Sequence, residues 1–218
     1  IINLGMLALS ALLITSTQMR EKRIWAVAAY ILYFPAVGLF AVGNYTLPVL
    51  LGTAIFLYAV KREDAPLSAL GLALLTFKPH IGILLALFGY GWLWTQKATF
   101  AIRARWMTLA ADLFLAVLGW LIEPNWISGL FNAIYTWQTA SYIQTCTYCS
   151  SPANIIMRLI RSEAGMLSSS FLSILLFVVA AGLVWIQRKK IFSSIQKTMA
   201  LAAALTAVVL PYMVNYDY

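Results

Sequence analysis

The chain has 218 residues, of which 62% are hydrophobic and only 10% are charged, and its formal net charge is +8. Soluble domains contain about 25% charged residues, so this composition excludes an ordinary soluble domain and indicates an integral membrane protein. The positive charges lie in short breaks between apolar runs. We therefore attribute them to membrane topology and expect no nucleic-acid partner.

Lysine and arginine gather at every second break between the apolar runs. Twelve of the fifteen basic residues lie in four such clusters, within 20–23, 61–62, 97–105 and 188–197. The intervening breaks contain only Lys78, Arg158 and Arg161. Such alternation is what the positive-inside rule predicts for a multi-pass membrane protein. It predicts that the four clusters face the cytoplasm and that the other breaks face outward.

The first apolar runs predict three membrane helices, over residues 1–17, 24–42 and 46–60. About 20 apolar residues cross a bilayer, and fewer suffice for a helix that ends in a protein-lined cavity. Pro35 is expected to kink the second helix. A tight outward turn at Gly43-Asn44-Tyr45 is expected to join the second helix to the third.

The stretch from Pro66 to Thr95 has two readings. It is either one long helix kinked at Pro79, or two short helices, 66–77 and 81–95, that meet at Lys78-Pro79-His80. One helix would put the cluster at 97–105 on the side opposite to the others. Two helices keep all four basic clusters on one side, so the charge pattern favours two.

The second half of the chain predicts two outward polar helices between further membrane helices. Asp112 lies within one apolar run, and we expect it to pair with a nearby basic residue. The predicted membrane helices cover 106–122, 164–186 and 198–214, and the predicted interfacial amphipathic helices cover 126–140 and 152–161. The expected fold is all-α, a polytopic membrane protein of about eight transmembrane helices, some short and broken. These form one domain over 1–218, which we interpret as a fragment of a longer chain.

Lys78-Pro79-His80 is the strongest candidate site. Pro79 prevents an uninterrupted helix, which frees backbone groups beside a cation and an imidazole. An ionisable residue between apolar runs is costly in hydrocarbon, and this cost makes it a candidate for function. Lys78 would bind a phosphate as a point charge, with His80 as a donor or proton carrier. The alternative is a lysine that extends from a helix end to the interface.

Cys146 and Cys149 are the only cysteines, in a polar segment expected to face outward. Their spacing allows a local disulfide, a redox pair or half of a zinc site. With no second pair, and with the single histidine distant in sequence, a local disulfide or two free thiols is favoured, and no metal site is expected.

Three motifs together resemble a known family. They are Gly43-Asn44-Tyr45-Thr46-Leu47-Pro48, Leu74-Leu75-Thr76-Phe77-Lys78-Pro79-His80, and Leu210-Pro211-Tyr212-Met213-Val214-Asn215-Tyr216-Asp217. Their order and approximate spacing resemble the C-terminal portion of glycosyltransferase family 87, polytopic enzymes of the GT-C superfamily. The resemblance covers most of the chain, and the Lys-Pro-His motif is its most specific part.

The resemblance implies a mannosyltransferase of the cell envelope. Such an enzyme transfers a hexose, usually mannose, from a polyprenyl-phosphate sugar to a glycolipid or glycan acceptor on the outer face of the plasma membrane. It needs no cofactor and generally no metal. Its general base is an acidic residue near the N-terminus, which matches no position in this sequence. Lys78 and His80 would then hold the donor phosphate, and the sugar or acceptor would contact Asn44, Tyr45, Asn215, Tyr216 and Asp217.

Two rival classes stay open. A transporter or flippase of a lipid-linked saccharide would also need intramembrane Lys and His residues and broken helices, although the sequence shows no inverted repeat. A non-catalytic membrane scaffold is the third reading. An outward acidic residue in an N-terminal region preceding this sequence would argue against the scaffold.

Overall fold

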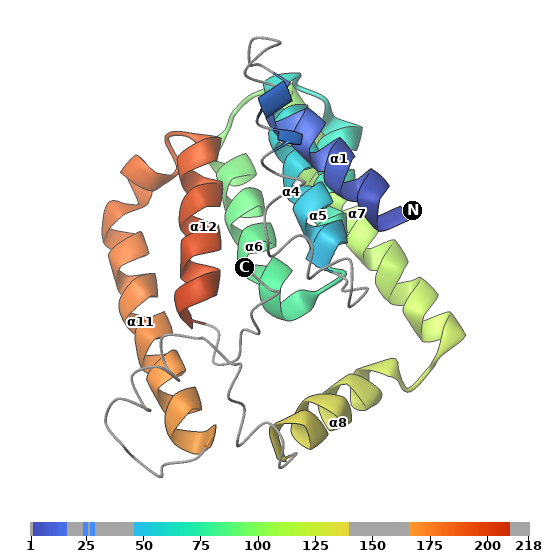
Figure 1. The fold of residues 1–218 in the computed structure, drawn as a ribbon, viewed down its shortest axis with the longest axis vertical. Helices are drawn as coiled ribbons and strands as arrows, with labels where there is room; N and C mark the ends of the chain where they lie inside the picture. The colour runs from blue at the N-terminus through green and yellow to red at the C-terminus, as the bar shows by residue number, and fades with distance from the viewer. Residues whose placement is uncertain (1, 17–23, 26, 29–45, 140–165, 210–218) are drawn as a thin grey trace.

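The computed structural model describes residues 2–16, 24–25, 27–28, 46–139 and 166–209, and every regular element within these ranges is helical (Figure 1). The expectation of an all-α fold is confirmed for this part of the chain. The helices are α1 (Ile2–Ile14), α4 (Thr46–Lys61), α5 (Ala65–Leu75), α6 (Pro79–Thr95), α7 (Thr99–Ile122), α8 (Trp126–Thr139), α11 (Met166–Ile191) and α12 (Ile195–Val209).

Antiparallel hairpins are formed by α4 with α5, α5 with α6, α6 with α7, and α11 with α12. α4 packs on α1 and α5, α5 packs on α6 and α7, and α12 packs between α6 and α11. α8 lies apart from the other helices, beyond the end of α7 (Figure 1). The largest apolar core runs through α4, α5, α6, α7 and α12, and includes the buried side chains of Phe56, Leu72, Leu93 and Met199.

The turn between α4 and α5 shows how the sequence ends one helix and starts the next. Glu63 adopts a left-handed backbone with φ of 55°, and the backbone N–H of Asp64 donates to the carbonyl of Ala59 at 3.0 Å. This is the hydrogen-bond pattern of a Schellman C-cap. Asp64 then caps α5, because its carboxylate accepts from the N–H of Leu67 at 2.9 Å.

Small residues let α4 and α5 approach closely. A Cβ atom added to Gly52 would lie 2.7 Å from the carbonyl oxygen of Gly71, and one added to Gly71 would lie 2.7 Å from the backbone nitrogen of Phe56. Buried hydroxyl groups also fit this helical core. Thr108 and Thr206 each donate to the carbonyl four residues earlier, at 2.8 Å. Small residues and internally bonded hydroxyl groups are typical of packed membrane helices.

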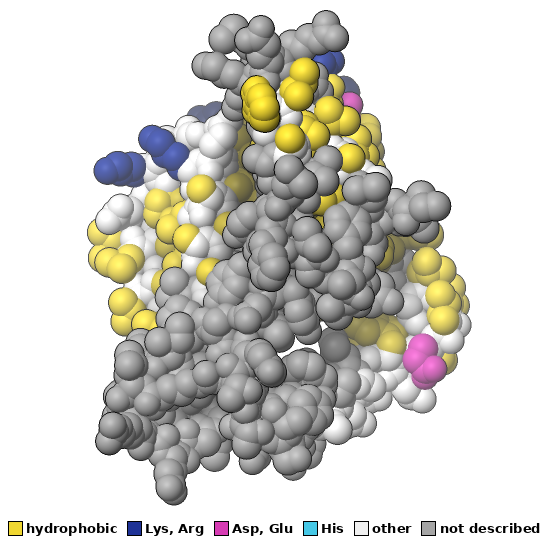
Figure 2. All heavy atoms as spheres, in the orientation of Figure 1, with side chains coloured by type: hydrophobic (Ala, Val, Ile, Leu, Met, Phe, Trp, Pro, Cys, Tyr) yellow, Lys and Arg dark blue, Asp and Glu magenta, His cyan; other side chains and the backbone are white. Residues whose placement is uncertain are grey.

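The turns α4–α5, α6–α7 and α11–α12 all lie at the same end of the bundle, the upper end in Figure 1. We call this the basic end, because basic residues lie in these turns or within about two turns of helix from them: Lys61, Arg62, Lys97, Arg103, Arg105, Arg188, Lys189, Lys190 and Lys197. Dark-blue side chains appear in the upper part of the molecule in Figure 2 as well. The predicted clustering of three basic segments is therefore seen in space.

The break predicted between 66 and 95 is confirmed, because α5 ends at Leu75 and α6 begins at Pro79. Two other boundaries were predicted too late. α7 begins at Thr99 rather than 106, and α12 at Ile195 rather than 198. Arg105 consequently lies within α7 rather than before it, and its Nε donates to the carbonyl of Leu93 at 3.0 Å while its Nη2 donates to that of Gln96. The arginine thereby satisfies the C-terminal carbonyls of α6 from within a helix.

One helix among the described residues, α7, is long and apolar enough to cross a membrane by length and composition, and α1, α4, α5 and α6 contain shorter apolar helical stretches. Large apolar side chains of α7 and α11 point away from the bundle. Those more than 60% exposed are Trp106, Leu113, Phe114, Leu121, Ile122, Ile174, Trp185 and Ile186. The second predicted helix falls mostly outside the described residues, as does all of 152–161.

Candidate functional site

The break between α5 and α6 is a tight fold-back with Lys78 at its centre. At the end of α5, the Thr76 hydroxyl donates to the carbonyl of Ala73 at 2.7 Å. Lys78 itself has a non-helical backbone, with φ of −130° and ψ of 83°, and Pro79 is the first residue of α6. Proline suits that position, because its fixed φ matches a helix and the absent N–H has no partner there in any case.

The carbonyl of Lys78 starts α6. It accepts from the N–H groups of Ile81 at 3.0 Å and Gly82 at 2.8 Å. Gly82 also allows the fold-back, because a Cβ atom at this position would overlap the carbonyl oxygen of Leu75 at 1.8 Å. No side chain other than glycine fits without separating α5 from α6.

The side chain of Lys78 reaches across to the start of α4. Its Nζ donates a hydrogen bond to the Thr46 hydroxyl oxygen at 2.8 Å, and both residues are half-buried. Each of the two residues also makes a further interaction. Thr46 is the first residue of α4, so this bond joins the N-terminal ends of α4 and α6. Helix N-termini carry partial positive charge, to which the lysine adds a full positive charge.

This site lies at the end of the bundle opposite to the basic end. α6 runs for 17 residues from Pro79 to Thr95, about 25 Å at the rise of an α-helix. α12 returns antiparallel to α6, since Leu205 near its C-terminal end lines the same cavity as Leu84 near the N-terminal end of α6. The ends of α4, α6 and α12 that adjoin the three motifs therefore lie at one end of the molecule.

The structure describes only part of the predicted site. Lys78 is in place, and His80 lies in the first turn of α6, although its imidazole is outside the described residues. Asn44 and Tyr45 directly precede Thr46 in the chain and are themselves outside the described residues, as is the segment that holds Asn215, Tyr216 and Asp217. The bond from Lys78 to Thr46 brings two of the three sequence motifs together.

Thr46 is the residue that sequence reasoning missed. It stands in the Gly43–Pro48 motif, but nothing in its sequence context indicates a lysine partner 32 residues away. The only available signal was a hydroxyl residue at the start of a predicted helix, after a predicted outward turn. The contact is tertiary, and it depends on the fold-back at Gly82.

Asp112 differs from its prediction. It makes no ion pair with any described residue, and its Oδ1 is buried without a hydrogen-bond partner. The reason is depth. Since α7 begins at Thr99, Asp112 lies about 20 Å along the helix, more than half of its length from the basic end. The nearest basic residue in the helix, Arg105, lies seven residues earlier, and its guanidinium donates to the carbonyls of Leu93 and Gln96 instead.

The described residues of the site offer a cation but no cluster of metal ligands. Among the described residues, no three His, Cys, Asp or Glu side chains gather in a way that would hold a metal ion. Cys146 and Cys149 lie outside the described residues. The arrangement at Lys78 offers an ammonium group and two helix N-termini, which is chemistry suited to an anion such as phosphate.

Comparison of the chain with protein-family models, with curated proteins and with solved structures gives no match.

Proposed function

We propose that this chain is the membrane-embedded part of a glycosyltransferase that uses a polyprenyl-phosphate sugar as donor. It transfers a hexose, mannose by the family resemblance, to a glycolipid or glycan acceptor on the outer face of the plasma membrane. The observation that carries the proposal is the bond between Lys78 and Thr46, which brings together a cation, two helix N-termini and two of the family-like motifs.

The exposed apolar side chains support placement in a bilayer. α7 and α11 expose aromatic and aliphatic residues along most of their described length. Exposed apolar patches of this extent mark contact with lipid or protein. With the basic end in the cytoplasm, the bundle crosses the membrane several times and Lys78 faces the outer side. α8, amphipathic and separate from the bundle, then lies along the outer interface.

The site suits a lipid-linked phosphate for electrostatic reasons. An ammonium group carries three N–H donors, so its bond to Thr46 is compatible with a bond to a phosphate oxygen. In the transfer reaction negative charge develops on the departing phosphate, and a fixed cation beside it stabilises that charge. The partial positive ends of α4 and α6 add to the same field. Lys78 thus acts on the leaving group, and an acidic residue elsewhere in the full-length protein acts as the general base for the acceptor.

The activity is tested with membranes that contain the full-length protein. We expect them to transfer labelled mannose from polyprenyl-phosphate mannose to an endogenous acceptor. The control supplies labelled nucleotide sugar while polyprenyl-phosphate mannose synthesis is blocked, and should give no transfer. Direct use of the nucleotide sugar would contradict the proposal.

A broken helix pair is also the kind of site that transporters use, so a flippase of a lipid-linked saccharide is the second candidate. The two differ in their products. A flippase moves the intact lipid-linked sugar across a vesicle bilayer without forming a new glycosidic bond. Translocation in the absence of any transfer product would favour the flippase.

A further inference from the structure

A groove between α11 and α12 combines two cations with a long apolar floor. It has a volume of about 410 Å³. Gln187, Lys190 and Lys197 lie towards the basic end, and apolar residues continue along both helices away from it: Ala180, Leu183, Val184, Leu201 and Leu205. All the polar lining residues therefore lie towards the basic end, where Ile191 also lines the groove, and the lining away from that end is entirely apolar.

The sequence spacing explains this segregation. On α11 the groove residues recur every three or four positions, at 180, 183–184, 187 and 190–191, and on α12 they recur at 197, 201 and 205. Residues at this spacing form one stripe along a helix. The two stripes face the same groove, and each ends in a lysine near the α11–α12 turn.

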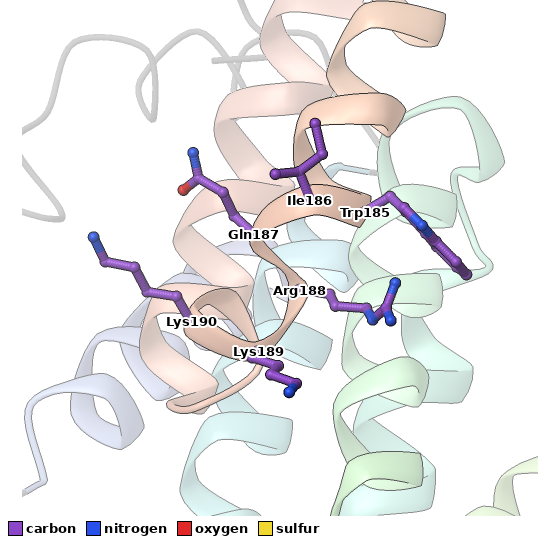
Figure 3. A pocket seen from close by; sticks show the side chains of 6 residues that line it. All are labelled: Trp185, Ile186, Gln187, Arg188, Lys189 and Lys190. Carbon is purple, nitrogen blue, oxygen red and sulfur yellow. The ribbon is translucent and has the colours of Figure 1, made fainter.

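The lysines of this groove have no acidic partner nearby in the chain. Neither α11, α12 nor the turn between them contains an Asp or Glu. Figure 3 shows that Gln187 and Lys190 point to one side of α11, whereas Trp185 and Arg188 point to the other. Arg188 lies over the ring of Trp185, 4.3 Å from its centroid. Arg188 is thus held away from the groove by its aromatic neighbour, which leaves Lys190 and Lys197 as the groove's cations.

We propose that this groove binds one anionic phospholipid of the inner leaflet. Its phosphate is held by Lys190 and Lys197, with the Gln187 amide as a neutral donor, and one acyl chain lies along Leu183, Leu201 and Leu205. Charge complementarity identifies the occupant, because a basic mouth above an apolar floor matches an anionic headgroup above its chain. A free phosphate would leave the apolar floor exposed, and a neutral lipid would leave the lysines unpaired.

The inference rests on the membrane placement but not on the proposed transfer reaction. The lipid site lies at the basic end, whereas Lys78 lies at the opposite end of the bundle. Anionic lipids are concentrated in the cytoplasmic leaflet, to which the basic end is assigned. The bound lipid would fix α11 against α12 and thus complete a surface that the described residues leave open.

The test is lipid retention by the full-length protein, measured by native mass spectrometry after delipidation and addition of a defined lipid. Dioleoyl phosphatidylglycerol should be retained and should raise the thermal unfolding midpoint, whereas dioleoyl phosphatidylcholine should do neither. Replacing both lysines, Lys190→Gln with Lys197→Gln, should weaken retention about five- to thirtyfold, since each basic residue near an anionic headgroup changes affinity by a factor of about five.

A matched control separates this site from general attraction to the basic end. Lys97→Gln with Arg103→Gln removes the same charge from exposed positions at that end, outside the groove, and should leave retention within twofold of wild type. Ala180→Phe fills the apolar floor but keeps both lysines. It should weaken retention of dioleoyl phosphatidylglycerol while sparing the dihexanoyl form.

Three results would overturn the proposal. They are equal retention of the two dioleoyl lipids, equal losses in the groove variant and its matched control, and equal stabilisation by inorganic phosphate. Because the readout is lipid retention, loss of sugar transfer has no bearing on it. A protein without transferase activity that still retains phosphatidylglycerol would contradict the proposed function alone.

Discussion

At the scale of single residues, two cations that the sequence places in breaks between apolar runs have different structural roles. Lys78 bonds across the molecule to the start of α4, whereas Arg105 closes the end of the helix that precedes its own. Arg105 also stacks on Trp94, 4.8 Å from the ring centroid. Sequence pattern placed both side chains in loops. Only the first prediction was correct: Lys78 lies between α5 and α6, whereas Arg105 lies inside α7 and reaches back to Leu93 from within the helix.

Arg105→Ala should destabilise the bundle. It removes hydrogen bonds from a charged group to the carbonyls of Leu93 and Gln96 as well as the stacking on Trp94. Hydrogen bonds to charged groups contribute about 1.5–3 kcal/mol each in protected sites, and Arg105 is half-buried, so we expect a loss of about 1–3 kcal/mol. Thermal unfolding in detergent measures it. Arg103→Ala, an exposed change two residues earlier, is the control and should shift the midpoint by no more than about 2 °C.

At the scale of elements, the sequence predicts the helices well and their ends less well. The division of residues 66–95 into two helices was predicted from Pro79 and from the requirement that all basic clusters lie on one side of the membrane. The structure confirms it, since α5 ends at Leu75 and α6 begins at Pro79. Helix ends predicted from the apolar runs alone come too early. The predicted helix over 164–186 ends before the basic residues, whereas α11 continues through them to Ile191. Long cationic side chains at a helix end extend away from it, so charge does not end the helix.

The contact between α4 and α5 gives a matched test of helix packing. Gly71→Ala should force the helices apart, because its Cβ would meet backbone atoms of α4 at 2.7 Å and 2.9 Å. Overpacking of this kind costs about 1–3 kcal/mol. Gly182→Ala on α11 has open space around it, and should be neutral or stabilising by up to about 1 kcal/mol. Unfolding midpoints that fall equally in both variants would contradict the close approach of α4 and α5.

At the scale of the whole molecule, sequence reasoning identified Lys78 in the candidate site but did not identify Thr46, the residue to which Lys78 donates a hydrogen bond. Lys78 was identified because a cation beside a proline between apolar runs is unusual. Thr46 was not, because its role depends on a contact between elements that no local pattern encodes. The pairing of Asp112 was predicted wrongly for a related reason: because α7 begins seven residues earlier than predicted, Asp112 lies about 10 Å farther from the start of its helix than the predicted boundary implied.

The topology is tested by labelling single cysteines in intact cells, with Cys146 and Cys149 first replaced. Cysteines introduced at Glu63, Gln96 and Gln187, at or near the basic end, should react with an impermeant reagent only after permeabilisation. A cysteine at Asn125, between α7 and α8, should react from outside, as should cysteines at Tyr45 and Tyr218. Labelling of Gln96 from outside would contradict the orientation and with it the outward position of Lys78.

The most direct test of the central claim, that Lys78 binds the donor phosphate, is sugar transfer by Lys78→Ala in the full-length protein at subsaturating polyprenyl-phosphate mannose. Loss of one charge-assisted bond, about 1.5–3 kcal/mol, predicts a roughly ten- to hundredfold lower rate at matched membrane levels. Lys78→Arg should recover part of the rate, because the charge remains while its geometry changes. Lys97→Ala, which removes a charge at the basic end, should leave the rate unchanged. A rate for Lys78→Ala within twofold of wild type would contradict the phosphate role.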